Sequence, residues 1–169
     1  MKNNKKLNNK KLNNKGFSLV ELIIVIAIMA VLVGVLAPAY LRYVEKSRKS
    51  ADIQAIDSIM IAMEVTAMSP EFGMKENDLM VAQFSNGVLT FDDTKTVVAN
   101  NESGVIAELL AVIGNYTTRS ASFKSFEING KVEHDGTVSF TITGTNAGDV
   151  LAYSNFEGRL KDGRTPETN

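Results

Sequence analysis

An uninterrupted apolar run near the start of the chain most constrains what this sequence can fold into. From Leu22 to Leu41, none of the residues carries a charge or an amide side chain. A helix of that length, rising ~1.5 Å per residue, reaches ~30 Å, which is the thickness of a bilayer's hydrocarbon core. A single segment inside lipid satisfies its own backbone groups only as an α-helix. The run therefore predicts a membrane-spanning helix.

A single carboxylate, Glu21, directly precedes this run, and Lys15 lies six residues before it. An ionisable side chain at membrane depth is costly unless it finds a partner or reaches the interface. We therefore predict that Glu21 is a functional residue. The alternative is that Glu21 only extends toward the lipid headgroups and has no further role.

Residues 1–15 contain six lysines and no acid, arranged as two overlapping copies of the pattern KKLNNK. Such a segment has too little apolar surface to build a core. Lysines beside an apolar segment keep that flank on the cytoplasmic side, which predicts that the rest of the chain lies across the membrane. An ordinary secretory signal cut near residues 35–37 is the alternative. It is disfavoured because the run exceeds the usual ~7 to 15 residues of a signal core.

The segment KGFSLVE at residues 15–21 resembles the processing site of type IV prepilins. It has a short basic leader, Gly16 before the cut, Phe17 as the new N-terminal residue, and Glu21 as the fifth residue of the mature chain. Pro38, the twenty-second residue after the proposed cut, lies where such pilins often carry a helix-breaking residue. The resemblance covers residues 1 to about 50. It implies cleavage between Gly16 and Phe17, N-methylation of Phe17, and filaments in which Glu21 meets the Phe17 amine of a neighbouring subunit.

The resemblance also implies a set of partners and a location. The partners are further copies of this chain in a helical filament, minor pilins, a prepilin peptidase, and an assembly platform whose cytoplasmic ATPases act indirectly. The subunit would span the membrane once and then join an extracellular pilus serving adhesion, surface motility or aggregation. One alternative is a pseudopilin of a type II secretion or DNA-uptake machine. Another is a membrane-anchored binding module that never polymerises.

Four segments follow from these patterns: a leader at 1–16, a membrane or filament-core helix at 17–41, its amphipathic continuation at 42–69, and a head at 70–169. The helix is predicted to end at Ser69, before Pro70. Gly34 and Pro38 predict a kink, because proline removes a helical hydrogen bond and clashes with the preceding turn. An apolar stripe at spacings of three and four predicts a face that covers a sheet. Its members are Ile53, Ile56, Met60, Met63 and Ala67.

The sequence of the head predicts an α+β fold, in which an antiparallel sheet packs on the amphipathic half of the long helix. Strands are predicted at 88–91, 96–99, 122–132, 137–143 and 150–156, with a brief helical turn at 79–82. The first two strands would form a hairpin across residues 92–95. A second helix begins after Asn101 and ends at Gly114. Its predicted inward side chains are Val105, Ile106, Leu109, Leu110 and Ile113.

Composition argues against several classes of function. Removal of the leader would take away six of the 18 basic side chains and leave 12 against 19 acidic ones, a formal charge of −7. That balance disfavours nucleic-acid binding. The sequence has no cysteine, which departs from the disulfide of many Gram-negative pilins, and we therefore predict a Gram-positive source. His134 is predicted to be a solvated turn residue, so neither an enzyme, a metal site nor a cofactor is expected. Three methionines, Met60, Met63 and Met68, are predicted to fill the core.

Overall fold

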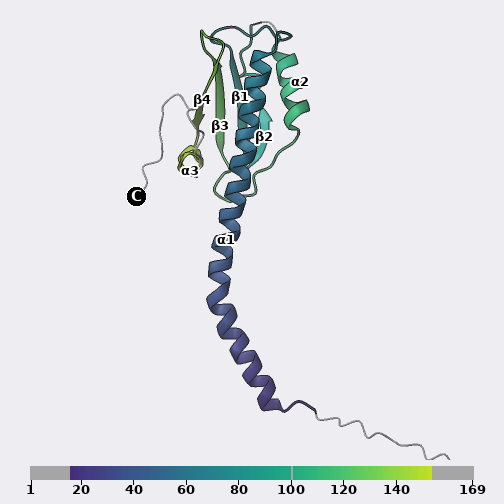
Figure 1. Ribbon diagram of the computed structural model, residues 1–169, viewed down its shortest axis with the longest axis vertical. Helices are drawn as coiled ribbons and strands as arrows, with labels where there is room; N and C mark the ends of the chain where they lie inside the picture. The colour runs from purple at the N-terminus through teal and green to yellow at the C-terminus, as the bar shows by residue number, and fades with distance from the viewer. Residues whose placement is uncertain (1–15, 100, 154–169) are drawn as a thin grey trace, which may run out of the picture. The chain divides into compact units, whose positions relative to one another are not determined.

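The computed structural model describes residues 16–99 and 101–153. The leader prediction falls mainly on residues 1–15, which lie outside the described residues. The chain divides into two compact units with a boundary between Leu41 and Arg42, and each unit is considered by itself. Helix α1, Leu19–Met68, runs through this boundary (Figure 1).

The part of α1 before Arg42 is helical along its whole length, including Gly34 and Pro38. Pro38 has no N–H to donate to the carbonyl of Gly34, which lies four residues earlier. Gly34 has no Cβ, and open space surrounds the position where one would lie. The kink at these two residues stays a prediction.

The unit beginning at Arg42 has two layers. Its sheet contains four antiparallel strands in the order β2-β1-β3-β4, and the second half of α1 crosses one face of it, with α2 beside α1 (Figure 1). The strands are β1, Leu79–Ser85, β2, Val88–Phe91, β3, Phe126–Val132, and β4, Val138–Thr143. The predicted fold class is confirmed.

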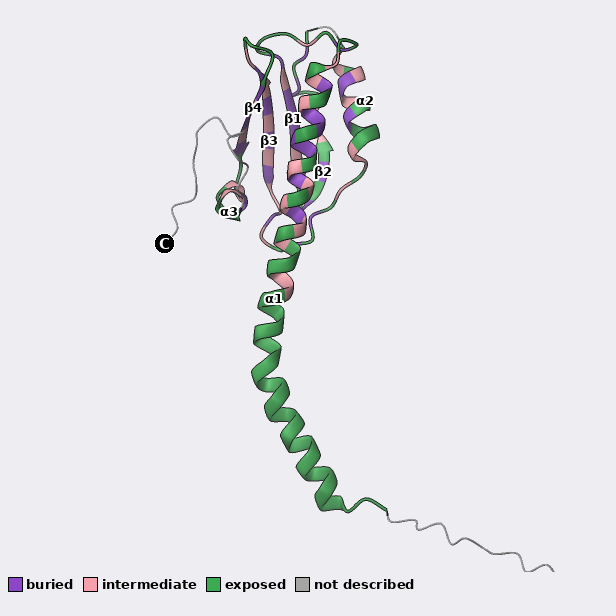
Figure 2. Ribbon diagram, in the orientation of Figure 1, coloured by how far each residue is buried: buried purple, intermediate pink, exposed green. Residues whose placement is uncertain are grey.

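The predicted apolar stripe on α1 forms the helical side of the core. Ile56, Met60 and Met63 are fully buried, and Ile53 and Ala67 pack against the same cluster. Figure 2 shows this change along α1, from exposed residues in its first half to alternating buried and exposed residues beside the sheet. One methionine differs from the prediction. Met68 is 63% exposed, because it lies on the face of α1 opposite to the sheet.

Strand β3 contains Gly130 at the point where α1 packs on the sheet. A Cβ there would lie 3.0 Å from Phe140 and 3.4 Å from the terminal methyl of Met63. The absence of a side chain therefore makes room chiefly for Phe140 of β4, beside which the Met63 methyl also lies. At the other end of the strand, the rings of Phe126 and Phe84 stack with centroids 4.3 Å apart. These contacts hold the middle of the sheet against α1.

The first hairpin of the head was predicted wrongly. Residues 79–82 are strand β1 rather than a helical turn, and β1 pairs with β2 across Asn86-Gly87. Both turn residues have positive φ, 52° and 81°, which is the conformation of a tight two-residue hairpin turn. The Asn-Gly pair was the signal that the prediction missed.

Residues 96–99 do not pair with β2 as predicted. They lie along the far end of β1, where Val97 exchanges two backbone hydrogen bonds of 2.8 Å with Leu79. Thr96 is buried, and its hydroxyl accepts a hydrogen bond from the Val81 N–H at 3.1 Å. The segment therefore continues along the edge of β1 beyond the end of β2.

Helix α2, Glu102–Ile113, begins and ends where predicted. The Asn101 side chain accepts a hydrogen bond from the Gly104 N–H, and Gly114 closes the last turn through its N–H to the Leu110 carbonyl. Val105 and Leu109 are buried as expected. Leu110 is wrong as an inward residue, because it is 42% exposed.

The strand pair β3 and β4 is confirmed, although β3 begins at Phe126 and β4 at Val138. The last predicted strand is wrong in its described part, since Ala147–Tyr153 forms helix α3. Residues 154–156 of that prediction lie outside the described residues. A short apolar run fits a strand and a helix equally well, and here one buried side chain, Val150, fixes a helical turn against the core.

Candidate functional site

The start of α1 is built by a reciprocal pair of side chains. Ser18 precedes the first helical residue, and its carbonyl accepts the first helical hydrogen bond, from Leu22 at 3.2 Å. The Ser18 hydroxyl accepts from the Val20 N–H at 3.3 Å. In return, the Glu21 carboxylate accepts from the Ser18 N–H at 2.8 Å. A serine followed three residues later by a glutamate is a capping box, which fixes where the helix begins.

The capping box places a negative charge where the helix favours it. The unpaired N–H groups of the first turn give a helix N-terminus a partial positive charge, which stabilises a carboxylate there. Only one oxygen of Glu21 takes part in the hydrogen bond to Ser18. The other oxygen can accept a second donor without opening the capping box.

Gly16 and Phe17 lie immediately before the capping box. Neither residue is helical, and the Phe17 side chain is 93% exposed. Phe17 is adjacent in the chain to the serine whose N–H binds Glu21. The structure therefore brings Phe17 and Glu21 to the same end of one helix, while Gly34 and Pro38 lie more than three turns away along it.

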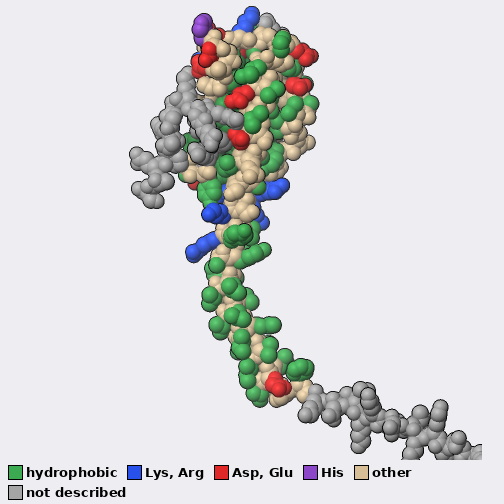
Figure 3. Space-filling view, in the orientation of Figure 1, with side chains coloured by type: hydrophobic (Ala, Val, Ile, Leu, Met, Phe, Trp, Pro, Cys, Tyr) green, Lys and Arg blue, Asp and Glu red, His purple; other side chains and the backbone are tan. Residues whose placement is uncertain are grey.

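The apolar residues that follow Glu21 have no packing partner among residues 16–41, the described part of their unit. The most apolar 18-residue window of α1 has a mean hydropathy of 3.1, and none of it is buried. By length and composition this helix is long and apolar enough to cross a membrane. Figure 3 shows apolar side chains around the helix here, with one acidic side chain near its start. The first half of α1 is therefore an exposed apolar helix with a single carboxylate, Glu21, at its N-terminal end.

A second carboxylate site lies in the head, and the sequence did not predict it. Asp52 is fully buried on α1. Its oxygens accept hydrogen bonds from the backbone N–H groups of Arg119 and Ser120 at 2.7 to 3.0 Å, and from the Tyr116 hydroxyl at 2.7 Å. Burial and the hydrogen bond to Asp52 both raise the pKa of the Tyr116 phenol above its usual value.

Two turns earlier on α1, Glu45 binds the same loop. Its carboxylate accepts from the Ser120 hydroxyl at 2.6 Å and from the Ala121 N–H at 3.1 Å. Arg48 lies 3.9 Å from Glu45, and the Lys49 ammonium lies 5.0 Å from the centre of the Tyr153 ring. These contacts attach the loop after α2 to the helix. Asp52 and Glu45 therefore act as anchors, which position the loop rather than perform chemistry.

Several other polar residues of the head serve its turns. His134 is exposed, and its Nδ1 lies 2.9 Å from a Glu76 oxygen. Hydrogen bonds from the side chain and backbone of Thr137 lower the pKa of Asp135, and those from Thr94 lower the pKa of Asp92. Within residues 16–99 and 101–153, no group of three His, Cys, Asp or Glu side chains is placed to hold a metal.

The long helix with an apolar first half and a second half packed on a four-stranded antiparallel sheet is consistent with the type IV pilin fold. Comparison with known families agrees. Residues 11–37 match the family described as the prokaryotic N-terminal methylation motif, a range that contains Gly16, Phe17 and Glu21.

A similar protein is the type IV major alpha-pilin of Moraxella bovis. It is 28% identical over 152 residues, which cover 88% of this chain and 80% of the relative. No solved structure matches the chain significantly. The motif and this relative support a pilin-type subunit, a structural class of protein.

Proposed function

We propose that this chain is a prepilin whose mature form is a structural subunit of type IV pili. A prepilin peptidase cuts between Gly16 and Phe17, the new amine of Phe17 is N-methylated, and the mature chains polymerise. The pilus serves adhesion, surface motility or aggregation. The observation that carries this proposal is the match of residues 11–37 to the methylation motif, a range that includes most of the apolar half of α1, which packs on none of the described residues of its unit.

The geometry at the start of α1 supports a specific role for Glu21 in assembly. Cleavage before Phe17 creates a cation next to Ser18, the residue to which Glu21 is already bound. The free oxygen of Glu21 can accept the amine of a neighbouring subunit while the other oxygen keeps the helix capped. A charge pair in a low-dielectric filament core is stronger than in water and more costly to leave unmatched. The pair therefore fixes the axial position of each subunit.

The apolar side chains of the first half of α1 supply the cohesion. They are about half to three-quarters exposed in the isolated subunit, so helix packing can bury a large area. Outside the membrane, each apolar Å² that the filament core keeps from water contributes about 25 cal/mol. Before assembly the same surface is covered by lipid, so the subunit is held in the membrane until it enters a filament. A Gram-positive source remains our inference from the cysteine-free sequence.

Two other functions use the same first helix. A pseudopilin of a type II secretion or DNA-uptake machine would be processed in the same way and form a short fibre. A membrane-anchored binding module would never polymerise. The similarity to a major pilin over most of the chain favours the pilus.

Mass spectrometry of the mature N-terminus tests processing. We expect a chain that begins with N-methylated Phe17 and lacks residues 1–16. A chain that keeps its leader, or one that is cut beyond Ala37, would overturn the proposal, because neither could present Glu21 and a new amine at the same helix end.

Replacement of the carboxylate tests assembly. In Glu21→Ala we expect surface filaments to be lost while the subunit still reaches the membrane, as electron microscopy and cell fractionation would measure. Asp93→Ala removes an exposed acid from a turn of the head and is the control that should assemble normally. Normal filaments in Glu21→Ala would overturn the role of Glu21 in assembly, whereas an unmodified chain that reaches the membrane and never forms filaments would favour the binding module.

A further inference from the structure

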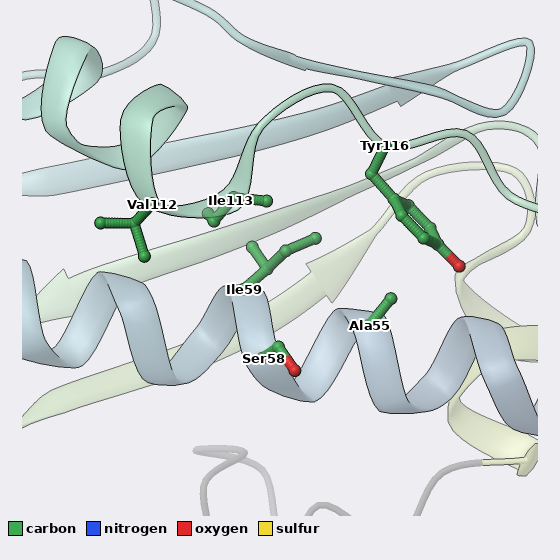
Figure 4. A pocket seen from close by; sticks show the side chains of 6 residues that line it. All are labelled: Ala55, Ser58, Ile59, Val112, Ile113 and Tyr116. Carbon is green, nitrogen blue, oxygen red and sulfur yellow. The ribbon is translucent and has the colours of Figure 1, made fainter.

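An apolar groove with acidic residues at its edge runs between α1 and α2 in the head. One part of about 240 Å³ is lined by residues of both helices and of the turn after α1. An adjoining part of about 250 Å³ shares Ser58 and Val112 with it. Figure 4 shows the second part, with Ile59 of α1 pointing toward Val112 and Ile113 at the end of α2.

The walls of the groove are apolar and open to solvent. Ile61 and Val65 line it from the face of α1 turned away from the sheet, and they are 40% and 63% exposed. Met68, 63% exposed, continues this stripe beyond the groove. Val112 of α2, 61% exposed, forms the opposite wall. This stripe is separate from the buried stripe of α1, so the fold of the head does not account for it.

Two carboxylates, Glu71 and Glu108, line the same groove. Both residues are exposed, and neither side chain has a hydrogen-bond or ion-pair partner among the residues that the structure describes. An occupant of this groove therefore needs apolar side chains for the walls and positive charge for the edge.

The chain itself carries a segment with these properties, which we call the basic neck: residues 42–46, where α1 enters the head unit. Arg42, Tyr43 and Lys46 are all exposed there, and Tyr43 is 72% exposed. The side chains of Arg42 and Lys46 have no ion-pair partner within the described part of the chain. Figure 3 shows Lys and Arg side chains gathered at this end of the head, and acidic side chains over the part that α1 and α2 build.

The basic neck cannot fill the groove of its own molecule. Tyr43 and Val65 lie 22 residues apart on one continuous helix, which corresponds to ~33 Å at 1.5 Å per residue. In a second copy lying parallel and displaced by that distance along the helix direction, the neck comes level with the groove of the first. Opposite charges at such an interface set register and exclude wrong partners.

We propose that the groove between α1 and α2 binds the basic neck of another subunit, with Tyr43 against Val65 and Val112 and with Arg42 and Lys46 facing Glu71 and Glu108. The proposal rests on filament assembly as the function and names the surface that joins the heads. Two contacts then set the position of each subunit in the filament. Glu21 sets it at the apolar end of α1, and the groove sets it in the head.

Disulfide trapping tests this contact directly, because the chain has no native cysteine. In the double variant Tyr43→Cys with Val65→Cys, we expect oxidised filaments to give a ladder of covalent multimers. The two sulfurs cannot pair within one chain, since Cα atoms more than ~7 Å apart are not bridged. The controls are each single variant, and Tyr43→Cys paired with Asp93→Cys on a remote turn. None of them should give a ladder.

Charge reversal tests the pairing of the two surfaces. Glu71→Lys with Glu108→Lys should lower the yield of sheared filaments about tenfold, because like charges across an interface cost several kcal/mol. Arg42→Glu with Lys46→Glu should do the same. The quadruple variant should regain most of the yield, while Asp93→Lys should change nothing. Membrane levels of the subunit, measured in parallel, should stay constant.

The outcomes separate this proposal from the proposed function. Normal filaments without a ladder, or a quadruple variant that assembles no better than the double variants, would overturn the groove contact and leave the pilus intact. An unmodified chain that never forms filaments would overturn both. A ladder together with rescue in the quadruple variant would support the contact.

Discussion

The two halves of α1 are continuous helix, but they differ in whether their apolar side chains are exposed or buried. In the first half, residues 19–41, the large apolar side chains stay about half or more exposed, and the only acid caps the helix. In the second half, residues 42–68, a stripe of apolar side chains is completely buried and an acid is buried with it. Apolar surface that is used inside the molecule stabilises a fold, whereas apolar surface left outside needs a lipid or protein partner.

A pair of methionine variants tests this contrast most strongly. Met60→Ala removes a fully buried side chain and should lower the free energy of unfolding of the head by about 2–5 kcal/mol. Met29→Ala removes the same side chain from the first half, where it is 60% exposed, and should leave head stability unchanged. Thermal unfolding of the full chain in detergent micelles measures both. Equal losses would contradict the division between the halves.

The two carboxylates provide the next comparison. Asp52→Asn keeps the shape of the side chain but turns an amide group toward backbone N–H donors, so about 3 kcal/mol of head stability should be lost. Tyr116→Phe removes one of the hydrogen bonds to Asp52 and should cost about 1 kcal/mol. Denaturant unfolding followed by near-UV circular dichroism would measure the difference. If Asp52→Asn left the stability of the head unchanged, the loop after α2 would have to be held by other contacts.

Removing the capping box should have a smaller effect on stability, confined to the first half of α1. Ser18→Ala removes the oxygen that binds the Val20 N–H, and an N-cap of this kind contributes about 1 kcal/mol. Hydrogen exchange in micelles should therefore speed up at Val20 and its neighbours and stay constant in the head. Ser18→Thr keeps the hydroxyl and is the matched control. Unchanged exchange at Val20 in Ser18→Ala would argue against the cap.

The smallest expected effect concerns a turn of the head. Hydrogen bonds from the Thr137 side chain and backbone hold the pKa of Asp135 below its usual 3.8. A lowered pKa in the folded state means that the turn is stabilised above the ordinary pKa and loses this stabilisation as the pH falls through the lowered value. Thr137→Val should raise the Asp135 pKa toward 3.8 in an NMR titration. Thr94→Val should leave Asp135 unchanged and act on Asp92 instead.

Prediction succeeded where a pattern is local and repeated. The apolar run, the stripe of Ile56, Met60 and Met63, and the cap at Asn101 each depend on side chains a few residues apart on one helix. It failed in the hairpin before β2, where Asn86-Gly87 carried a local signal that went unused. It also failed at α3, because a short apolar run near Val150 does not distinguish strand from helix.

Ser18 could have been found from sequence, since serine and glutamate three residues apart form the capping-box pattern. Asp52 could not. It lies one turn before Ile56, in line with the buried stripe, but helix periodicity does not show whether a charge at that position will find partners. Its burial follows from the backbone N–H groups of Arg119 and Ser120, which lie more than 65 residues further along the chain.

Patterns among neighbouring residues are enough to predict the apolar rod, the position of its one carboxylate and the α+β class of the head, because helix periodicity and membrane length are local properties. The folded structure is needed to see which strands pair with β1, why an aspartate is buried, and where an apolar groove with acidic edges remains open between α1 and α2. These features depend on segments that meet only after folding, and their energies come from contacts that no stretch of sequence contains.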